Sequence, residues 1–206
     1  MRNIFDKHYK RYDAWYDKNR FVYLSEQEVL KKILPKKGDG LEVGVGTGRF
    51  ASPLGIRTGV DLSGSMIQIA KRRGVNVCQA NGESLPFKDR VFDYALIVIT
   101  LCFVKSPLKL LKETRRVLKK DGKIIIGIVD RYSFLGKFYM VKKSFFYKYA
   151  RFFSVKKIVS LLKIAGFNRF LFYQTLYGPL EEISSAEKPK KGFGEGGFVT
   201  IGAYKV

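Results

Sequence analysis

The sequence predicts an α/β protein whose sheet is doubly wound, mostly parallel and covered by helices on both faces. Short apolar runs alternate along the chain with segments of helical periodicity, the order that such a fold requires. Residues 92–99 are apolar almost throughout, as expected of a central strand buried on both faces. Three glycines at alternate positions, residues 44–48, follow an earlier apolar run and indicate a strand that turns sharply into a helix. Parallel crossovers place a ligand at the carboxyl ends of the strands.

Length and composition favour a single domain that spans residues 1–206. No apolar run is long enough to span a membrane and no signal-peptide core follows the first residues, so we expect a soluble, cytoplasmic protein. Cys78 and Cys102 lie in apolar surroundings without metal-ligand spacing, which predicts reduced packing residues and no metal site. The oligomeric state is left open.

The chain is strongly basic, with 39 Lys and Arg against 18 Asp and Glu and a formal net charge of +21. Such a charge favours RNA, an anionic membrane surface or an acidic small molecule as a partner. A lysine-rich surface is equally typical of thermophilic proteins. Composition therefore leaves the two explanations open.

The first 24 residues carry aromatic side chains at three- and four-residue steps, among them Phe5, Tyr12 and Trp15. This spacing predicts one face of a helix that covers an apolar surface. The segment Ser25 to Glu28 has the pattern of a capping box, so we expect a second helix to begin there and to end near Pro35. The first strand follows at residues 41–43.

The glycine turn comprises Gly44, Gly46 and Gly48. Glycine permits positive φ and lets the backbone approach a ligand with no Cβ between them. Asp61 lies 17 residues after Gly44, at the end of the next strand, where a carboxylate can accept hydrogen bonds from both ribose hydroxyls of a nucleoside. Arg49 stands where the dinucleotide fingerprint needs glycine, which disfavours an NAD-dependent dehydrogenase.

A short helix is expected after Gly48, because Pro53 and Gly55 interrupt it early. Ser63 can cap the next helix, which ends at Gly74. The predicted elements that complete the chain are a strand at residues 75–78, the strand at 92–99, a helix opened by Ser106 and Pro107, a strand at 123–129, a helix at 154–166, and an edge hairpin of strands 167–175 and 197–206 joined by a mobile polar connection.

In these motifs the chain resembles the class I S-adenosylmethionine-dependent methyltransferases, whose first motif reads like the run from Glu42 to Gly48. Residues 79–87 are similar to the adenine loop of the ubiquinone and menaquinone (type 11) branch, which usually has Asp where Asn81 stands. The resemblance implies a three-layer Rossmann-like methyltransferase fold with seven mostly parallel strands, an antiparallel C-terminal edge hairpin and an N-terminal helical lid at residues 1–24.

The resemblance also implies S-adenosylmethionine as cofactor and S-adenosylhomocysteine as product. Glu42 would orient the amino group of the methionine moiety and Asp61 the ribose, while Tyr12 would be the lid contact. The full set of implied cofactor-binding residues is Tyr12, Glu42, Gly44, Val45, Gly46, Gly48, Asp61, Leu62, Met66, Asn81, Gly82, Glu83 and Val98.

Residues 131–157 hold ten aromatic and eight basic residues and no acidic one. We interpret residues 131–153 as an acceptor-binding insertion, whose aromatic side chains line an apolar pocket and whose basic side chains meet an anion at its rim. RNA stacking, a lipid surface or a plain helical cap with snorkelling lysines would explain the same composition. The residues concerned are Phe134, Phe138, Tyr139, Phe145, Phe146, Tyr149, Phe152 and Phe153, with Lys137, Lys142, Lys143, Lys148 and Arg151.

The leading hypothesis is an enzyme that transfers a methyl group in line to a small-molecule acceptor, either anionic or aromatic and lipophilic. An RNA methyltransferase and a non-catalytic protein that binds S-adenosylmethionine are the alternatives. Methyl transfer from a sulfonium needs alignment and exclusion of water more than a base, so no catalytic residue is assigned. Asp130 and Tyr12 are the candidates if a proton must be removed.

Overall fold

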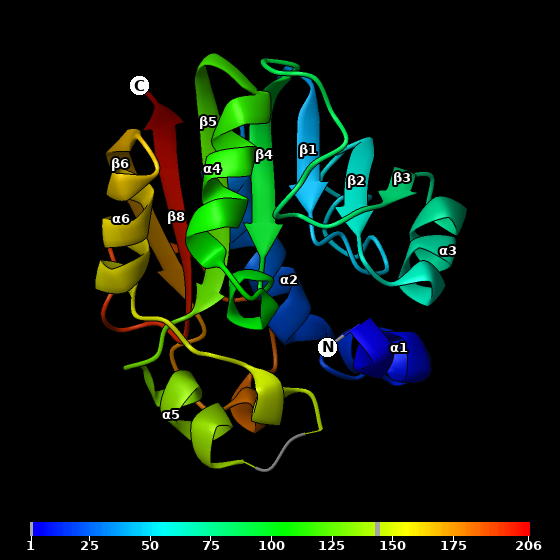
Figure 1. Cartoon of the computed structure of the whole chain (residues 1–206). Coiled ribbons are helices and arrows are strands. Elements are labelled where there is room, and N and C mark those ends of the chain that lie inside the picture. The colour runs from blue at the N-terminus through cyan, green and yellow to red at the C-terminus, as the bar shows by residue number, and fades with distance from the viewer. Residues whose placement is uncertain (1, 143–144) are drawn as a thin grey trace.

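A computed structural model describes residues 2–142 and 145–206 of the chain. Among them is an eight-stranded sheet with the order β3-β2-β1-β4-β5-β8-β6-β7 (Figure 1). Neighbouring strands pair in parallel from β3 to β5, and the chain order reverses between β1 and β4. This reversal is the position at which open α/β sheets bind ligands. The five parallel strands are β1 Gly40–Val43, β2 Thr58–Asp61, β3 Asn76–Gln79, β4 Phe92–Val98 and β5 Leu118–Val129.

The C-terminal strands complete the sheet in antiparallel fashion, as predicted. They are β6 Phe167–Thr175, β7 Lys190–Lys191 and β8 Phe198–Lys205, and β8 lies between β5 and β6. The two-residue strand β7 was not expected, because the polar connection between β6 and β8 was predicted to be mobile. It pairs with β6, and the Glu187 carboxylate in the same connection accepts hydrogen bonds from the backbone amides of Leu176 and Tyr177 at 2.6 and 3.1 Å.

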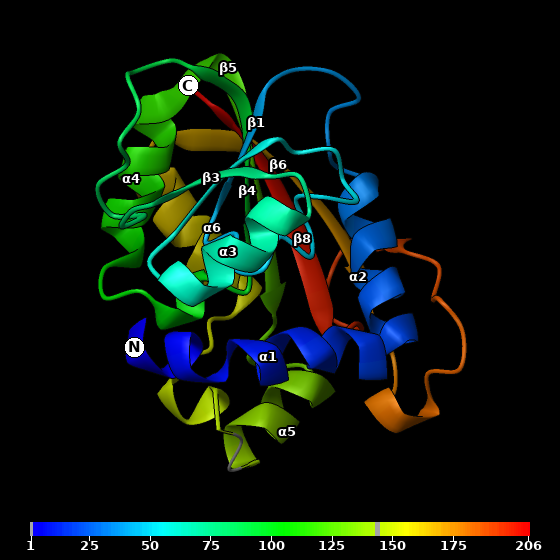
Figure 2. The ribbon, with the colours of Figure 1, turned by 90° about the vertical axis from the view of Figure 1, so that its right-hand side faces the viewer.

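Helices cover both faces of the sheet, as Figure 2 shows from the edge. Residues of β4 divide between two buried clusters, since Ile97 packs with the α4 and α6 side while Leu96 packs with the α2 side. This alternation is what a central strand with two covered faces requires. The helices are α1 Arg2–Lys18, α2 Arg20–Lys31, α3 Gly64–Arg72, α4 Pro107–Val117, α5 Phe134–Val141 and α6 Val155–Ile164, with short 3₁₀ turns η1 Leu101–Phe103, η2 Tyr147–Tyr149 and η3 Leu180–Glu182.

The helix α1 does not join either layer. It runs across the end of the sheet toward which the parallel strands point, with α5 on its far side (Figures 1 and 2). The predicted helical aromatic face is confirmed, and its members Tyr12, Trp15 and Tyr16 pack with the core cluster on the α2 side. The carboxyl ends of the strands are therefore covered by the N-terminal helix.

The predicted capping box is wrong. The helix α2 begins at Arg20, and Ser25 lies fully buried inside it. Its hydroxyl donates a hydrogen bond of 2.7 Å to the Phe21 carbonyl and accepts one of 2.9 Å from the Glu187 amide. A serine whose hydroxyl has both a donor and an acceptor partner is tolerated within a helix. The capping-box pattern therefore does not mark the start of this helix.

The helix expected after the glycine turn is also absent, since residues 47–55 form successive hydrogen-bonded turns instead. The Ser52 amide donates to the Gly48 carbonyl at 3.1 Å and the Leu54 amide to the Phe50 carbonyl at 3.2 Å, but no continuous helix results. Proline and glycine so soon after the turn prevent helical bonds from propagating. Within the described residues no helix is both long and apolar enough to cross a membrane.

Candidate functional site

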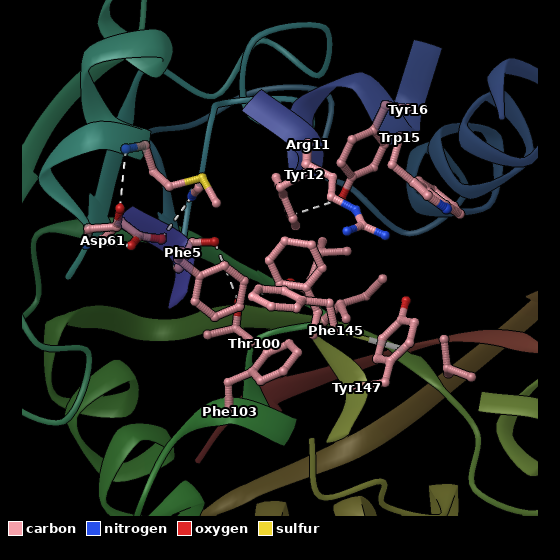
Figure 3. A pocket seen from close by; sticks show the side chains of 18 of the residues that line it. Phe5, Arg11, Tyr12, Trp15, Tyr16, Asp61, Thr100, Phe103, Phe145 and Tyr147 are labelled. Carbon is pink, nitrogen blue, oxygen red and sulfur yellow. Dashed lines mark hydrogen bonds between the residues drawn. The ribbon is translucent and has the colours of Figure 1, made fainter. Parts of the chain in front are cut away.

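A cavity of about 1240 Å³ lies at the carboxyl ends of β1, β2 and β4, beneath α1. Figure 3 shows it from close by, with Asp61 at one end and Tyr16 and Tyr147 toward the other. It brings together nine of the thirteen predicted cofactor-binding residues, namely Tyr12, Gly44, Gly46, Asp61, Leu62, Met66, Asn81, Gly82 and Val98.

The carboxylate of Asp61 joins the glycine turn to the tip of β2. Its Oδ2 accepts a hydrogen bond of 2.9 Å from the Gly46 amide and its Oδ1 one of 2.8 Å from the Ser63 amide. Burial raises the pKa of Asp61, and these backbone hydrogen bonds oppose that rise. Each carboxylate oxygen can accept more than one hydrogen bond, so Asp61 can also accept hydrogen bonds from hydroxyl groups of a ligand in the cavity.

The first two glycines of the turn are needed for different reasons. Gly44 has φ +78°, and a Cβ built there would lie 2.3 Å from Oγ1 of Thr100, so the tip of β4 fills that space. Gly46 has φ +53°, and a Cβ there would have the Tyr12 hydroxyl as its nearest neighbour, at 3.6 Å. Gly44 is therefore a packing requirement, whereas Gly46 leaves its backbone open to the cavity below Tyr12.

At the adenine side expected from the sequence, Leu62 is exposed at the cavity edge and Met66 is buried in it. Oδ1 of Asn81 accepts a hydrogen bond of 2.9 Å from the Glu83 amide, which closes the turn. A Cβ on Gly82 would lie 2.8 Å from Val43, so this glycine allows the loop to approach β1. The loop is thus held against the strand tips.

Two predicted residues, Glu42 and Glu83, do not line the cavity. Glu42 is 1% exposed at the end of β1, and its Oε2 has no hydrogen-bond partner among the described residues. Burial holds the pKa of Glu42 well above its usual range. Oε1 of Glu83 accepts a hydrogen bond of 3.0 Å from the Ser106 amide, so Glu83 fastens the adenine-side loop to the start of α4.

Val45 and Gly48 are likewise away from the cavity, on the core side of the turn. Val45 is buried against Gly59, where an added Cβ would lie 2.8 Å from it. A Cβ on Gly48 would lie 3.2 Å from Ala70 of α3. Both residues therefore let the turn pack closely on its neighbours.

An ion-pair network fastens α1 to the glycine turn and was not predicted from the sequence. Arg49 bonds Asp13 at 2.9 Å and Asp17 at 2.7 Å, and Arg73 of the segment after α3 bonds Asp13 at 2.8 Å. Burial opposes ionisation of Asp13, but hydrogen bonds from Arg73 and Arg49 outweigh it and hold the pKa of Asp13 well below its usual range. The only signal in the sequence was the four-residue spacing of the two aspartates on one helix face.

A second contact holds the beginning of α1. Oδ1 of Asp6 accepts hydrogen bonds from the Ser63 hydroxyl at 2.6 Å and from the Ser65 amide at 3.2 Å. Together with the network around Asp13, it fixes α1 over the cofactor end of the cavity.

Aromatic side chains dominate the other end of the cavity. The Phe5 ring stacks on Phe146 with 5.5 Å between centroids and meets Phe103 edge-on at 5.1 Å. The hydroxyls of Tyr12 and Tyr16 are 2.8 Å apart (Figure 3). Residues from α1 and from the segment around η2 thus meet over this end, which places part of the predicted acceptor-binding insertion in the cavity wall.

Only some of the predicted insertion residues take that position. Tyr139, Phe145 and Phe146 line the cavity, whereas Phe134 and Tyr149 are exposed at 58% and 50%. The structure thus corrects the expected aromatic lining: a helix must expose one side, and α5 turns Phe134 outward.

The predicted basic rim is partly present. Lys142 and Lys148 line the cavity, with their ammonium groups 4.8 Å from the ring centroids of Phe138 and Tyr149. The guanidinium of Arg151 lies 4.9 Å from the Phe153 ring centroid. Lys143 falls outside the described residues.

Glu26, which lies within the segment predicted to be a capping box, lines the cavity instead. It is 2% exposed, and burial raises its pKa to about 8. Its position between Val22 and Leu30 on the buried face of α2 was visible in the sequence as a carboxylate within an apolar stripe.

Asp130, a candidate for proton removal, does not reach the cavity. Its Oδ1 accepts a hydrogen bond of 3.1 Å from the Val155 amide at the start of α6. Tyr12 does line the cavity, but burial raises its pKa well above the usual range, which disfavours the phenolate. Among the described residues there is no cluster of His, Cys, Asp and Glu that could hold a metal ion.

Comparison with known proteins agrees with this geometry. A family model described as a methyltransferase domain matches residues 41–126. The chain is 51% identical to the uncharacterized protein MJ1123 of Methanocaldococcus jannaschii, over 99% of this chain and 100% of that protein. It is 28% identical to a demethylmenaquinone methyltransferase of a Geobacillus species, over 68% of this chain and 71% of that protein.

The fold also matches solved structures. A crystal structure from Thermotoga maritima, described as a "SAM-dependent methyltransferase, possible histamine N-methyltransferase", superposes with a TM-score of 0.97, at 49% identity and with 100% of both chains covered. The glycine turn, the acidic residue at the tip of β2 and the switch point of the sheet occur together, and the similarity extends over the whole chain. The chain therefore belongs to the S-adenosylmethionine-dependent methyltransferases, and S-adenosylmethionine is its methyl donor.

Proposed function

We propose that the enzyme methylates a small molecule, which binds in the aromatic end of the cavity beside the cofactor. The observation that carries this proposal is the size and division of the cavity. Its volume of about 1240 Å³ exceeds the roughly 300–1,000 Å³ of a typical site for one small ligand. One end holds the predicted cofactor residues and the other is lined by Tyr16, Tyr139 and Phe146, so both reactants can lie in a single cavity.

The residues at the cofactor end fit the cofactor. The carboxylate of Asp61 is suited to the ribose hydroxyls, and the open backbone at Gly46 to the amino-acid tail. Leu62 and Met66 offer apolar surface to a purine ring, and the loop at Asn81 offers polar groups to its edge. When bound, the cofactor supplies a methyl group on a positively charged sulfur.

We propose that Glu42 accepts a hydrogen bond from the amino group of the cofactor's methionine moiety. The support for this role is the buried Oε2 that has no hydrogen-bond partner among the described residues. Because Glu42 lies behind the cavity wall, this role requires the side chain to reach past the glycine turn. Val45, Gly48 and Glu83 are proposed to act indirectly, by shaping the turn and the adenine-side loop.

The chain's contribution to the reaction is alignment and exclusion of water. α1 covers the cavity, and the Phe5 and Phe146 rings meet across it. The Tyr12 hydroxyl lies over Gly46 and lines the cavity. Alignment of this kind lowers the barrier of an in-line displacement without a dedicated base.

The RNA alternative rests on the net charge of +21 and on the aromatic and basic composition of residues 131–157. A small acceptor is favoured because the aromatic end is covered by α1 on one side and by residues around η2 on the other. The description of the Thermotoga maritima protein also names a small molecule, histamine.

A transfer experiment tests the proposal. The purified enzyme is incubated with S-adenosylmethionine carrying a labelled methyl group and with a cell extract, which is then separated into small molecules, RNA and lipid. We expect label in the small-molecule fraction. Label confined to RNA, with affinity for RNA that falls steeply with salt concentration, would replace the small-molecule assignment with the RNA alternative.

A further inference from the structure

The cavity contains a buried acid for which the described residues supply no ion-pair partner. Glu26 projects from α2 into the cavity and is 2% exposed. Its Oε2 has no hydrogen-bond partner, and no Lys or Arg nitrogen lies within ion-pair distance of the carboxylate, among the residues that the structure describes. Burying a carboxyl group without a partner is costly, so its presence at a cavity wall indicates a ligand group that completes it.

Tyrosine rings line the same cavity as this carboxyl group. Tyr16 and Tyr139 line the same cavity, and Tyr147 lies between the Tyr139 and Phe152 rings with centroids 4.2 and 5.6 Å away. Burial raises the pKa values of five tyrosines, Tyr12, Tyr16, Tyr23, Tyr139 and Tyr147, and the charge of Glu26 adds to each rise.

The cavity is lined by further acids and also by four basic residues, Arg11, Lys18, Lys142 and Lys148, but among the described residues none of these cations forms an ion pair with Glu26. Glu181 of η3 also lines the cavity and adds to the raised pKa of Tyr139. The guanidinium of Arg11 lies 5.9 Å from the Phe145 ring centroid and the ammonium of Lys148 lies 4.8 Å from that of Tyr149. These cations pack on ring faces at the rim and do not neutralise Glu26.

A cavity that combines a carboxyl group with several aromatic rings is an environment that can bind an ammonium group. Ring faces attract cations through their negative quadrupole, and the attraction strengthens when water is excluded. A carboxylate in the same compartment supplies a charge-assisted hydrogen bond to the ammonium N–H. An anionic acceptor group, which the basic insertion suggested, would instead meet Glu26 and Glu181 as like charges.

We propose that Glu26 and the rings of Tyr16, Tyr139 and Tyr147 form a subsite for the positively charged amine of the methyl acceptor. This inference rests on the proposed function, because it assigns the acceptor to the same cavity. The substrate class is then a small amine with an apolar body. Its ammonium group binds at Glu26 and its body packs against the aromatic wall near Phe146.

A pair of probes of equal shape tests the subsite. Phenethylamine carries an ammonium group, and phenethyl alcohol is its neutral counterpart. Both are titrated by calorimetry into the enzyme saturated with S-adenosylhomocysteine. We expect the amine to bind at least roughly tenfold more tightly than the alcohol, from the charge-assisted bond and the ring contacts together.

Proton release gives a second readout, which a merely structural role of Glu26 would not produce. The carboxyl group is protonated well below its raised pKa of about 8. A bound ammonium favours the ionised carboxylate, so at about pH 6.5 each molecule of phenethylamine that binds should release close to one proton. The number of protons released is obtained from the dependence of the binding enthalpy on the buffer. Phenethyl alcohol should displace none.

Three variants make the test specific. Glu26→Gln keeps the shape of the side chain and should abolish both the preference for the amine and the proton release. Tyr139→Leu removes a ring and should weaken amine binding while proton release persists. Glu28→Gln changes an exposed acid of the same helix, which pairs with Lys31 at 2.8 Å, and should behave as wild type.

The outcomes separate this inference from the proposed function. If the alcohol binds as tightly as the amine, if Glu26→Gln retains the preference, or if neither probe binds while S-adenosylhomocysteine does, the amine subsite is overturned and the small-molecule proposal stands. A folded enzyme that fails to bind S-adenosylhomocysteine would instead overturn the proposed arrangement of the cofactor.

Discussion

The backbone amide of Gly46 donates a hydrogen bond of 2.9 Å to Oδ2 of Asp61. Gly46 lies in the turn that follows β1 and Asp61 is the last residue of β2, so this bond ties the turn to the tip of β2. It also fixes the carboxylate of Asp61 at the cavity wall before any ligand binds. The cofactor end is therefore preorganised by its own backbone, which lowers the ordering cost of binding.

Replacement of Asp61 by Asn should weaken S-adenosylhomocysteine binding by roughly tenfold to a hundredfold, because a charged hydrogen-bond acceptor contributes about 1.5–3 kcal/mol. Calorimetric titration measures the change. Asp89→Asn is the control, since Asp89 is exposed and pairs with Arg116 far from the cavity. Equal affinity of wild type and Asp61→Asn would remove Asp61 from the cofactor site.

The two glycines should respond differently to alanine. In Gly44→Ala the new Cβ meets Thr100 at 2.3 Å. Overpacking should cost about 1–3 kcal/mol and the positive φ about 1–2 kcal/mol of unfolding free energy. In Gly46→Ala only the φ cost applies, but the methyl group enters the cavity below Tyr12 and should reduce S-adenosylhomocysteine affinity.

Denaturant unfolding and calorimetry together distinguish these two effects. Gly44→Ala should lose more unfolding free energy than Gly46→Ala. Gly46→Ala should lose more affinity for S-adenosylhomocysteine relative to the unfolding free energy that it loses. The opposite ranking would mean that Gly44, and not Gly46, presents the open backbone to the cofactor.

Asp13→Asn should loosen α1, because Asp13 bonds both Arg49 and Arg73. We expect a loss of about 1–3 kcal/mol in unfolding free energy at neutral pH, as for hydrogen bonds to charged groups. Since the pKa of Asp13 is lowered on folding, its contribution is complete above the unfolded value of about 3.9 and declines as pH falls through and below it.

The measurement is unfolding free energy of wild type and variant as a function of pH. The difference between them should be constant near neutrality and shrink in acid. Asp17→Asn is the matched control, because Asp17 is exposed and bonds Arg49 alone. A difference that grows in acid would contradict the ion-pair explanation.

Glu26 should make the enzyme less stable as pH rises. Its pKa is raised by burial to about 8, so the folded protein holds a proton that the unfolded chain loses above about pH 4.3. The unfolding free energy contributed by this proton is complete in acid, falls as pH rises from about 4.3 to about 8, and then levels off.

Glu26→Gln removes this titration. The variant should therefore gain stability relative to wild type with rising pH, by up to a few kcal/mol at about pH 8.5. Denaturant unfolding at several pH values measures it, with Glu28→Gln as a control that should show no such trend. Parallel pH curves for wild type and Glu26→Gln would refute the buried, unpartnered state of Glu26.

The sequence predicted those features that depend on short segments. The apolar run at residues 92–99 became β4, and the alternating glycines with Asp61 marked the strand tips, because period and turn chemistry act over a few residues. The features it missed are contacts across the fold. In the sequence, Arg49 indicated only that the dinucleotide fingerprint lacks a glycine. Its contact with Asp13, which lies 36 residues earlier, forms only in the folded chain.

Glu26 illustrates the same limit. Its local sequence satisfies the capping-box pattern, and nothing nearby reveals that Ser25 finds a partner in Glu187, which lies 162 residues later. Once that contact places Ser25 inside the helix, Glu26 faces the cavity. A pattern that is decided by distant residues is ambiguous when read locally.

The position of β8 between β5 and β6 has a consequence for how the protein is made. β6 leaves the ribosome first but cannot join the sheet until β8 has emerged to bridge it to β5, with pairings such as Ile126 to Ile201. Contacts so distant along the chain form late and slowly. Nascent chains that stall within the connection from β6 to β8 would expose an unpaired edge of β5, where chaperones or aggregation partners could attach.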